Sequence, residues 1–501
     1  MAEPFYITTA ISYPNGRPHI GHAYEAIAAD AMARFRRAQG RDVRFVTGTD
    51  EHGLKMIQTA RATGRDTLEF ADEMSGYFRE MCSMLNISYD AFVRTSEPRH
   101  YEASTAIWKA MEANGDLYLD RYEGWYSVRD EAFYDDSELV EGEGGEKLSP
   151  QGTPVEWTAE ETWFFRLSKY QEPLLALYCD NPEFIRPESR RNEVMRFVEG
   201  GLKDLSVSRT SFDWGVPVPG SPGHVMYVWV DALTTYMTGV GFPEREGEFE
   251  RFWPADVHLI GKDIVRFHAV YWPAFLMSAG LRLPKQVFGH GFILAKGGEK
   301  MSKSLGNVVD PMDMAERYGV DALRYFLLRE VSFGQDGSYS HEAIVNRVNS
   351  ELANSFGNLA QRSLSMIFKN LDGIIPLAGE AEADRALLDE VDRACAELDR
   401  EFDRFAFSVG LEAWMSGVFA CNAYIDAAAP WALKKSDPDR MAAVLGTLVV
   451  AVRKLAEAAA PVIPGSAEKL IELIDSGKEG APITQPVPIF PRLELGEEEA
   501  A

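Results

Sequence analysis

Residues 5–40 read FYITTAISYPNGRPHIGHAYEAIAADAMARFRRAQG, and this stretch decides the fold. Phe5 to Ile11 is apolar and rich in β-branched residues, which predicts a buried strand. Tyr13-Pro14-Asn15-Gly16 has the composition of a turn, and Gly21 to Gln39 contains helix-forming residues up to a terminating Gly40. A strand that leads through a turn into a helix predicts an α/β domain.

Two histidines lie at this predicted strand-to-helix junction, His19 and His22. The start of a helix presents unpaired backbone N–H groups and the positive end of the helix dipole, and an imidazole adds a directed donor. Gly21 lets a ligand approach the backbone closely. On its own the H-x-x-H spacing is more often a local cap or a surface feature than a phosphate site.

A second candidate lies far downstream, at Lys300-Met301-Ser302-Lys303-Ser304. It follows Lys296-Gly297-Gly298-Glu299, and it combines two ammonium groups with two small hydroxyl donors, which suits a triphosphate. An ordinary solvated loop has the same composition. Because the two segments occur in this order, a nucleotide site is favoured over a local helix cap at the histidines and an ordinary solvated loop at the lysines.

The composition is that of a large globular protein. At 501 residues the chain should hold about two to four domains, and 46% of its residues are hydrophobic. No apolar run is long enough to cross a bilayer, and the four cysteines are widely separated single residues, so we predict a cytoplasmic protein in a reducing compartment. The net charge of -26 requires local basic patches wherever a nucleic acid binds.

The pattern along the chain divides it into five segments. Strands and helices alternate over 1–117, including a strand at Arg44 to Thr47 that ends in Gly48-Thr49-Asp50-Glu51-His52-Gly53. An aromatic and acidic stretch over 118–222 reads as an inserted subdomain, and the α/β pattern resumes over 223–295 and continues into 296–350. Long segments with helical spacing fill 351–501, before an acidic tail.

We therefore expect a Rossmann-like, doubly wound parallel sheet with an inserted subdomain, followed by an all-α helix bundle. Ligands of such sheets bind at the carboxyl ends of the strands, where Thr8, His19, His22 and Asp50 would gather.

Two sets of residues recur at helical spacing in the second half of this α/β region. Trp229, Ala232 and Tyr236 form one set, and Ile264, His268 and Trp272 form the other. Core packing is the ordinary explanation of an aromatic stripe, and a ligand pocket is the alternative that His268 favours.

Four further segments strengthen the signal from residues 300–304. They are YPNGRPHIGH (13–22), GTDEHG (48–53), YVWVDA (227–232) and GKDIVRFH (261–268). Together they make the chain resemble the methionyl-tRNA synthetases of the short bacterial branch, which are class I aminoacyl-tRNA synthetases, over nearly its whole length. The resemblance implies activation of methionine with ATP to methionyl-adenylate, release of pyrophosphate, and transfer of methionine to the terminal adenosine of tRNA(Met).

The resemblance also implies which residues form the site. Asp50 would hold the α-ammonium of methionine, and the remaining pocket residues would be Ile11, Tyr13, Trp229, Ala232, Leu233, Tyr236, Ile264, His268 and Trp272. Aromatic walls with one polar donor suit a polarizable thioether. Because apolar fit discriminates weakly, the chain is expected to admit homocysteine and to need editing of it.

The resemblance also implies which residues contact the nucleotide. For Glu25 and His290, a role on a helix surface or in a loop stays open as the alternative. The implied contacts are Thr8, His19, Gly21, His22, Glu25, Gly261, Asp263, His290, Lys300, Met301, Ser302, Lys303 and Ser304. Of these, His19, His22, Lys300 and Lys303 would stabilise the transition state at the α-phosphate, with Mg²⁺ on the phosphates and no protein nucleophile.

The helical region would read the anticodon of initiator and elongator tRNA(Met), while 296–350 would hold the lysine loop and a stem-contact segment. Asn358 and Arg362 share a helical face, and Pro430-Trp431 is predicted to end a helix, with Lys434 and Lys435 supplying local positive charge. Helix-end packing is the alternative role for Trp431.

The chain departs from zinc-bearing relatives in its insertion. Residues 126–133 read YSVRDEAF and contain no cysteine, so no zinc is expected and the insertion should be held by packing of Trp125, Tyr126, Phe133 and Trp157. A monomer is expected. Two alternatives stay open, a class I synthetase for leucine, valine or cysteine, and a catalytically silent RNA-binding paralogue.

Overall fold

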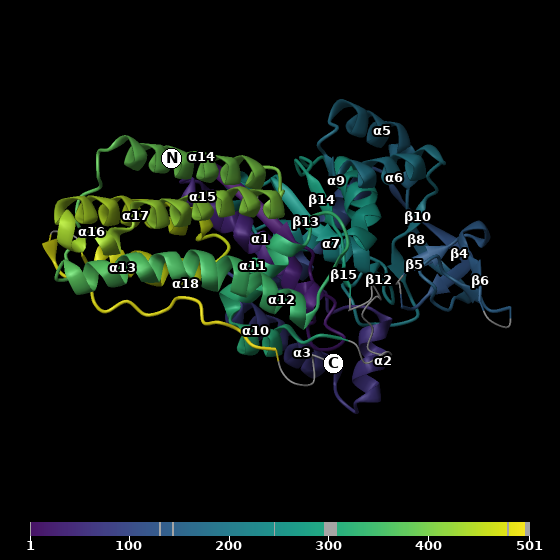
Figure 1. Ribbon diagram of the computed structural model, residues 1–501. Coiled ribbons are helices and arrows are strands. Elements are labelled where there is room, and N and C mark those ends of the chain that lie inside the picture. Colours follow the sequence, from purple (N-terminus) through teal and green to yellow (C-terminus); the bar gives the residue numbers. More distant parts are fainter. Residues whose placement is uncertain are drawn as a thin grey trace. The chain divides into compact units, whose positions relative to one another are not determined.

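A computed structural model describes residues 2–129, 132–142, 145–244, 246–294, 308–477 and 480–495 (Figure 1). Within these residues the chain divides into two compact units. The first holds residues 1–18, 40–81 and 88–290, and the second holds 19–39, 82–87 and 291–501.

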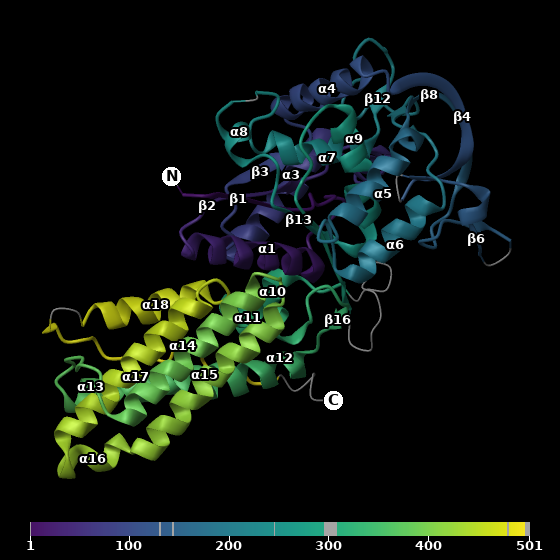
Figure 2. The same cartoon turned by 90° about the horizontal axis from the view of Figure 1, so that it is seen from above.

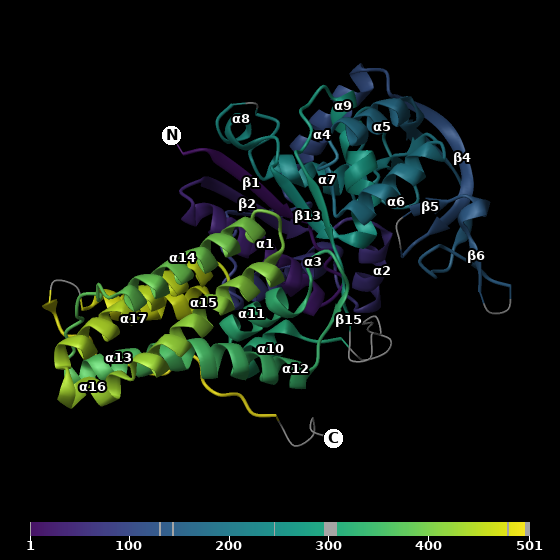
Figure 3. The ribbon, with the colours of Figure 1, turned by 45° about the horizontal axis from the view of Figure 1, so that its top comes forward.

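The first unit is built on a six-stranded parallel sheet. The strand order is β3 (Ala91–Arg94), β2 (Asp42–Thr49), β1 (Pro4–Thr9), β13 (Val257–Gly261), β14 (Val287–His290) and β9 (Ile185–Arg186). Figure 3 shows β1, β2 and β13 side by side. The chain runs outward from β1 to β3 on one side and from β13 to β14 on the other, where the earlier strand β9 forms the edge, so the order reverses between β1 and β13. This reversal is the switch point at which doubly wound sheets bind their ligands.

Helices cover the sheet because its strands are apolar on both faces. On one face Tyr6, Val46 and Val93 pack in a single core with residues of α4 (Pro98–Ala113), α7 (Val228–Thr238) and α9 (Trp272–Ser278). The other helices of this unit are α2 (Leu54–Ala62), α3 (Thr67–Met84), α5 (Gln171–Asp180), α6 (Glu188–Glu199) and α8 (Glu248–Phe252).

The insertion forms an antiparallel sheet of its own. Its order is β10 (Leu205–Ser206), β8 (Glu156–Phe165), β4 (Leu117–Ser127) and β5 (Ala132–Tyr134), and Figure 2 shows the long, curved β4 and β8 together. The short pairs are β6 (Val140–Glu141) with β7 (Lys147–Leu148), and β11 (Ser208–Arg209) with β12 (Val225–Met226). The Trp125 and Trp157 rings meet edge to face at 5.3 Å, with the Lys147 ammonium 4.2 Å from the Trp125 ring.

The second unit is helical apart from one short strand pair, β15 (Ile293–Leu294) with β16 (Gly337–Ser338), among its described residues. It begins with α1 (Ile20–Ala38), and the chain re-enters it at α10 (Pro311–Tyr318), α11 (Val320–Glu330) and α12 (His341–Arg347). A π-helical segment at Val348–Gly357 joins α12 to α13 (Asn358–Asn370). The remaining helices, drawn together in Figure 2, are α14 (Glu382–Phe402), α15 (Phe407–Ala428), α16 (Pro430–Ser436), α17 (Pro438–Ala459) and α18 (Pro464–Asp475).

The predicted fold class, a Rossmann-like sheet followed by a helix bundle, is confirmed. The helices α10 and α11 are separated at Gly319, whose φ of +88° no helix accommodates. One predicted detail is wrong. Pro430 begins a helix instead of ending one, because α15 stops at Ala428, Ala429 turns the chain with φ 43°, and proline fits a first helical turn. None of the helices in the described part of the chain is long and apolar enough to span a membrane.

Candidate active site

The switch point of the sheet brings together Thr8 and a histidine that sequence reasoning missed. Thr8 on β1 is paired directly with His258 on β13, and its Oγ1 lies 2.8 Å from His258 Nδ1. The other ring nitrogen of His258 accepts from Trp272 Nε1 at 3.3 Å. His258 interrupts an apolar strand, and no motif singles it out, so only its register opposite Thr8 reveals it.

Tyr236 and His268, both predicted pocket residues, are hydrogen-bonded to each other. His268 Nδ1 lies 2.9 Å from the Ile264 carbonyl, which can only accept, so the proton sits on Nδ1 and Nε2 accepts from the Tyr236 hydroxyl at 2.6 Å. A π-helical turn at Phe267–Tyr271 precedes Trp272 and helps place Ile264, His268 and Trp272 in one group. Trp229 stacks on Phe267 with centroids 3.8 Å apart and meets His268 edge-on at 5.9 Å.

Burial keeps both histidines neutral. It lowers the pKa of His268 to about 4, against the smaller opposing effect of the Ile264 hydrogen bond, and it lowers the pKa of His258 well below its usual value, with the nearby His268 adding to the effect. Ala232 and Leu233 are also buried on α7. The result is an aromatic, uncharged environment with directed polar groups, which suits an apolar side chain that carries one weak acceptor.

The neutral histidines predict a loss of stability in acid. The pKa of His268 is about 4 in the folded chain against an ordinary value of 6.5, so the unfolded chain takes up the proton first as pH falls. The stability is fully present above pH 6.5 and is lost as pH falls toward 4. We expect His268 alone to lower the free energy of unfolding by about 2 kcal/mol between pH 7 and pH 5. Urea denaturation at both values measures it, and His268→Gln should show a smaller difference than the unaltered chain.

Asp50, Ile11 and Tyr13 are drawn together where β1 and β2 end. The backbone N–H of Ser12 donates to the Gly48 carbonyl at 2.9 Å, and the N–H of Asp50 donates to the Ser12 carbonyl at 2.9 Å. The Tyr13 hydroxyl accepts from the Met56 N–H at 3.1 Å. These backbone hydrogen bonds hold the segment after β1 beside the segment after β2, beyond the last paired residues of the sheet.

Gly261 and His290 are paired residues at the carboxyl ends of β13 and β14. A Cβ on Gly261 would lie 2.7 Å from Asp263 Oδ1, so the glycine leaves room for this carboxylate. Of the predicted nucleotide residues, the first unit therefore groups Gly261, Asp263 and His290 at neighbouring strand ends, and Thr8 lies on the adjoining strand.

In the second unit, His19 and His22 cap the first turn of α1. His19 Nδ1 accepts from the Gly21 N–H, and His22 Nδ1 accepts from the His19 N–H, each at 3.1 Å, while the two ring centroids lie 3.8 Å apart with the planes tilted by 31°. Because both Nδ1 atoms accept, each neutral ring carries its proton on Nε2. A Cβ on Gly21 would lie 2.9 Å from His19 Cε1, so the glycine makes this packing possible. Glu25 follows on α1 and is partly buried.

Lys300, Met301, Ser302, Lys303 and Ser304 lie outside the described residues. Among the described ones, no group of histidine, cysteine, aspartate or glutamate side chains is arranged to hold a metal ion.

The predicted RNA-reading residues form a partly exposed group in the second unit. The Arg362 guanidinium lies 5.3 Å from the centre of the Trp431 ring and pairs with Asp426 at 3.1 Å. The Trp431 side chain is 50% exposed, Pro430 behind it is buried, and Asn358 is exposed one turn before Arg362 on α13. An exposed indole with a guanidinium beside it can stack on an unpaired base.

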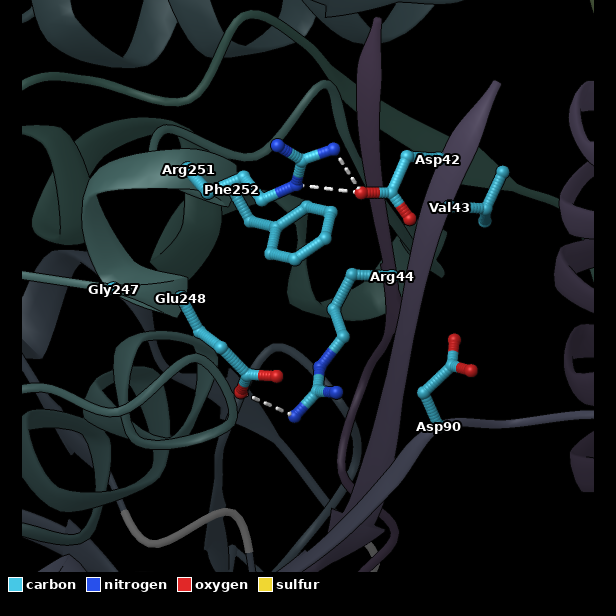
Figure 4. Close-up of a pocket in the computed structure, with 8 residues that line it drawn as sticks. All are labelled: Asp42, Val43, Arg44, Asp90, Gly247, Glu248, Arg251 and Phe252. Carbon is cyan, nitrogen blue, oxygen red and sulfur yellow. Dashed lines mark hydrogen bonds and ion pairs between the residues drawn. The ribbon is translucent and has the colours of Figure 1, made fainter. Parts of the chain in front are cut away.

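A cavity of about 530 Å³ lies elsewhere in the first unit (Figure 4). Asp42 at the start of β2 and Asp90 just before β3 place it at the amino ends of the strands, away from the switch point. Its arginines are already paired, Arg44 with Glu248 at 2.9 Å and Arg251 with Asp42. It is therefore a polar hollow separate from the predicted site.

A family model described as tRNA synthetases class I (M) matches residues 5–364, and one described as the anticodon binding domain of methionyl tRNA ligase matches residues 375–496. With the switch point of the parallel sheet, these matches define a class I aminoacyl-tRNA synthetase.

Individual relatives are similar to this chain over nearly its full length. The methionine–tRNA ligase of Brucella suis is 56% identical over 505 residues and covers 98% of each chain, and that of Mesorhizobium japonicum is 59% identical over 473 residues, with 94% and 91% covered. The structure of Mycobacterium tuberculosis methionyl-tRNA synthetase in complex with methionyl-adenylate superposes with a TM-score of 0.94 at 54% identity, covering 98% of this chain and 100% of that one. The chain therefore belongs to the methionyl-tRNA synthetase family, ATP-dependent ligases that join methionine to tRNA for protein synthesis.

Proposed function

We propose that this chain binds methionine between Asp50 and the aromatic wall of α7, and activates it with ATP. The observation that carries the proposal is the neutral His268–Tyr236 pair inside that wall, because a charged histidine there would favour a polar side chain over a thioether. The full-length similarity to methionine–tRNA ligases supports the same assignment. The pocket is completed by Ile11, Tyr13, Trp229, Ala232, Leu233, Ile264 and Trp272.

The chemistry needs no nucleophile from the protein. The methionine carboxylate attacks the α-phosphate of ATP, which enters as its Mg²⁺ complex, and pyrophosphate leaves. A hydroxyl of the terminal adenosine of tRNA then attacks the methionyl carbonyl, and AMP leaves. Asp50 would orient the ammonium group, while His19, His22, Lys300 and Lys303 would neutralise charge that develops on the phosphates. Thr8, Gly21, Glu25, Gly261, Asp263, His290, Met301, Ser302 and Ser304 would complete the nucleotide site.

The test is amino-acid-dependent exchange between ATP and pyrophosphate, with Mg²⁺, a zinc chelator and no added zinc. Exchange with methionine and none with leucine, valine or cysteine supports the proposal. Exchange with one of the others would refute the pocket assignment, and exchange with none would favour the silent RNA-binding alternative. If methionine-dependent exchange occurs without the chelator and is lost when the chelator is added, the expectation that zinc is not needed is refuted.

We also propose that Asn358, Arg362, Pro430 and Trp431 read the anticodon of tRNA(Met). The exposed Trp431 ring beside Arg362 supports this, and the match of residues 375–496 to an anticodon-binding domain agrees. The proposed working form is a cytoplasmic monomer, because the enzyme must meet cytoplasmic initiator and elongator tRNA and each chain carries both sets of residues. The domain limits at 117, 222, 295 and 350 stay predictions.

Trp431→Ala should impair use of tRNA and spare activation of methionine. Stacking of a base on an aromatic ring contributes about 1–3 kcal/mol, so kcat/KM for tRNA(Met) should fall roughly 5- to 150-fold. Steady-state aminoacylation measures this, and pyrophosphate exchange without tRNA should stay unchanged. Phe419→Ala, another exposed aromatic residue of the second unit, is the matched control. Equal losses in both variants would contradict a role specific to Trp431.

A further inference from the structure

Asp231 is a buried carboxylate that the mechanism above does not use. It lies on α7 between Trp229 and Ala232, and its side chain is 1% exposed. Its two oxygens accept from histidines of two other elements, Oδ2 from His52 Nδ1 at 2.5 Å and Oδ1 from His100 Nε2 at 2.6 Å. His52 follows β2, and His100 lies on α4. One carboxylate thus ties α7 both to the loop after β2 and to α4.

The far side of each imidazole is held as well. His52 Nε2 lies 3.1 Å from the Tyr101 hydroxyl, and His100 Nδ1 lies 2.9 Å from Thr238 Oγ1. Burial would raise the pKa of Asp231, but the two histidines outweigh it and lower this pKa to about 2, so the group is ionised. Hydrogen bonds to an ionised group in a buried site are strong and directional, which makes this a stiff connection.

The loop that carries His52 also carries Asp50. Between them, Glu51 is fixed by Arg94 at 2.7 Å and by Thr49 at 2.7 Å. The Trp214 ring packs edge-on against His52 at 5.4 Å, and its indole N–H donates to the Glu51 carbonyl at 2.5 Å. Glu51 and His52 therefore have one well-defined position each, and the backbone leading back to Asp50 is fixed with them.

We infer that Asp231, His52 and His100 are positioning residues that set the spacing between Asp50 and the pocket wall on α7. The inference rests on the proposed function, in which Asp50 holds the α-ammonium and Trp229 and Ala232 contact the side chain. Because the distance between Asp50 and the wall on α7 is fixed, the site selects amino acids by the length from their ammonium group to their terminal methyl. Loss of the connection lets the loop and α7 shift apart, so longer side chains are accepted.

Asp231→Asn tests this inference, because it keeps the size of the side chain and removes its charge. The readout is pyrophosphate exchange with methionine and with ethionine, which is longer by one methylene. One methylene is worth about 10- to 200-fold in selectivity, so we expect the ratio of kcat/KM for methionine to that for ethionine to fall by about fivefold or more. The KM for methionine should rise about tenfold while the KM for ATP stays within about twofold of its original value. A ratio of two substrates does not depend on how much of the enzyme is folded, so a purely structural role would not change it.

Two further variants separate the inference from general damage. Thr234→Val removes a buried hydroxyl of the same helix. This hydroxyl donates to the Val230 carbonyl at 2.8 Å, and its loss should leave the selectivity ratio unchanged. Tyr101→Phe removes only the partner of His52 Nε2, and it should lower the ratio about twofold, which keeps the inference testable if Asp231→Asn does not fold.

The possible results are distinct. If the unaltered chain exchanges with methionine and both Asp231→Asn and Tyr101→Phe keep its selectivity ratio, the positioning role is refuted while the proposed function stands. If Thr234→Val lowers the ratio as far as Asp231→Asn does, the effect belongs to α7 in general and the inference is again refuted. If the unaltered chain shows no methionine-dependent exchange, the proposed function and this inference fall together.

Discussion

His22→Asn should lower kcat for methionine activation by about 10²- to 10³-fold, the usual cost of one donor to a developing charge. Asparagine places its Oδ1 where His22 Nδ1 accepts from the His19 N–H, so the helix cap is kept, but the Nε2–H is lost. The KM for methionine and the midpoint of thermal unfolding should therefore change little. Pyrophosphate exchange at saturating methionine and ATP measures the effect.

His22→Gln is the matched variant. Glutamine carries an amide N–H near the position of Nε2 and cannot accept from the His19 N–H in the same geometry. If His22 contributes a donor to the phosphates, the glutamine variant should be the more active and the less stable of the two. The reverse order, with the asparagine variant fully active, would show that His22 is only a helix cap.

Arg324→Met should destabilise the second unit by about 3–5 kcal/mol, the cost of breaking a buried ion pair from one side. The Arg324 side chain is fully buried and donates to Asp30 Oδ2 at 2.6 Å. It also donates to the carbonyls of Pro461 and Val462, each at 2.9 Å, and of Leu85 at 3.1 Å. Methionine fills a similar volume but leaves the three carbonyls without this donor, and Asp30 Oδ2 keeps its pair with Arg34.

Urea denaturation followed by far-ultraviolet circular dichroism measures this loss. Arg34→Met is the control, because Arg34 pairs with the same Asp30 oxygen at 2.8 Å but is 24% exposed. Water can replace its guanidinium, so we expect only about 1 kcal/mol. Equal losses in the two variants would contradict the importance of burial at Arg324.

The elements whose signals are local could be predicted from sequence. β1 and α1 were predicted because an apolar β-branched run, a Pro-Asn-Gly turn and a helix-forming run follow each other, and the structure has β1 at Pro4–Thr9 and α1 at Ile20–Ala38. The Trp229 and His268 sets were found because their spacing is regular. Local pattern also failed at Pro430, where a proline after α15 suggested an end and the conformation of Ala429 made it a beginning.

The groups that depend on distant pairing could not be predicted. His258 acquires its partners from β1 and from Trp272, and Asp231 acquires His52 and His100 from segments 179 and 131 residues away. Each of these residues sits in an apolar or mixed stretch whose periodicity says nothing about its neighbours across the fold. Register and packing of the folded chain bring them together.

The cap of α1 illustrates how folding and chemistry compete for the same position. A helix is best begun by aspartate, serine or asparagine, and an acidic first turn stabilises it further, yet this helix begins with His19 and has no acidic residue in its first turn. Two neutral imidazoles satisfy the amide groups of His19 and Gly21 without adding negative charge. An aspartate cap with an acidic first turn would stabilise the helix further but would repel a triphosphate from the positive helix end, so selection for folding alone would replace these histidines. The chain accepts a weaker helix start in exchange for an end that remains attractive to anions.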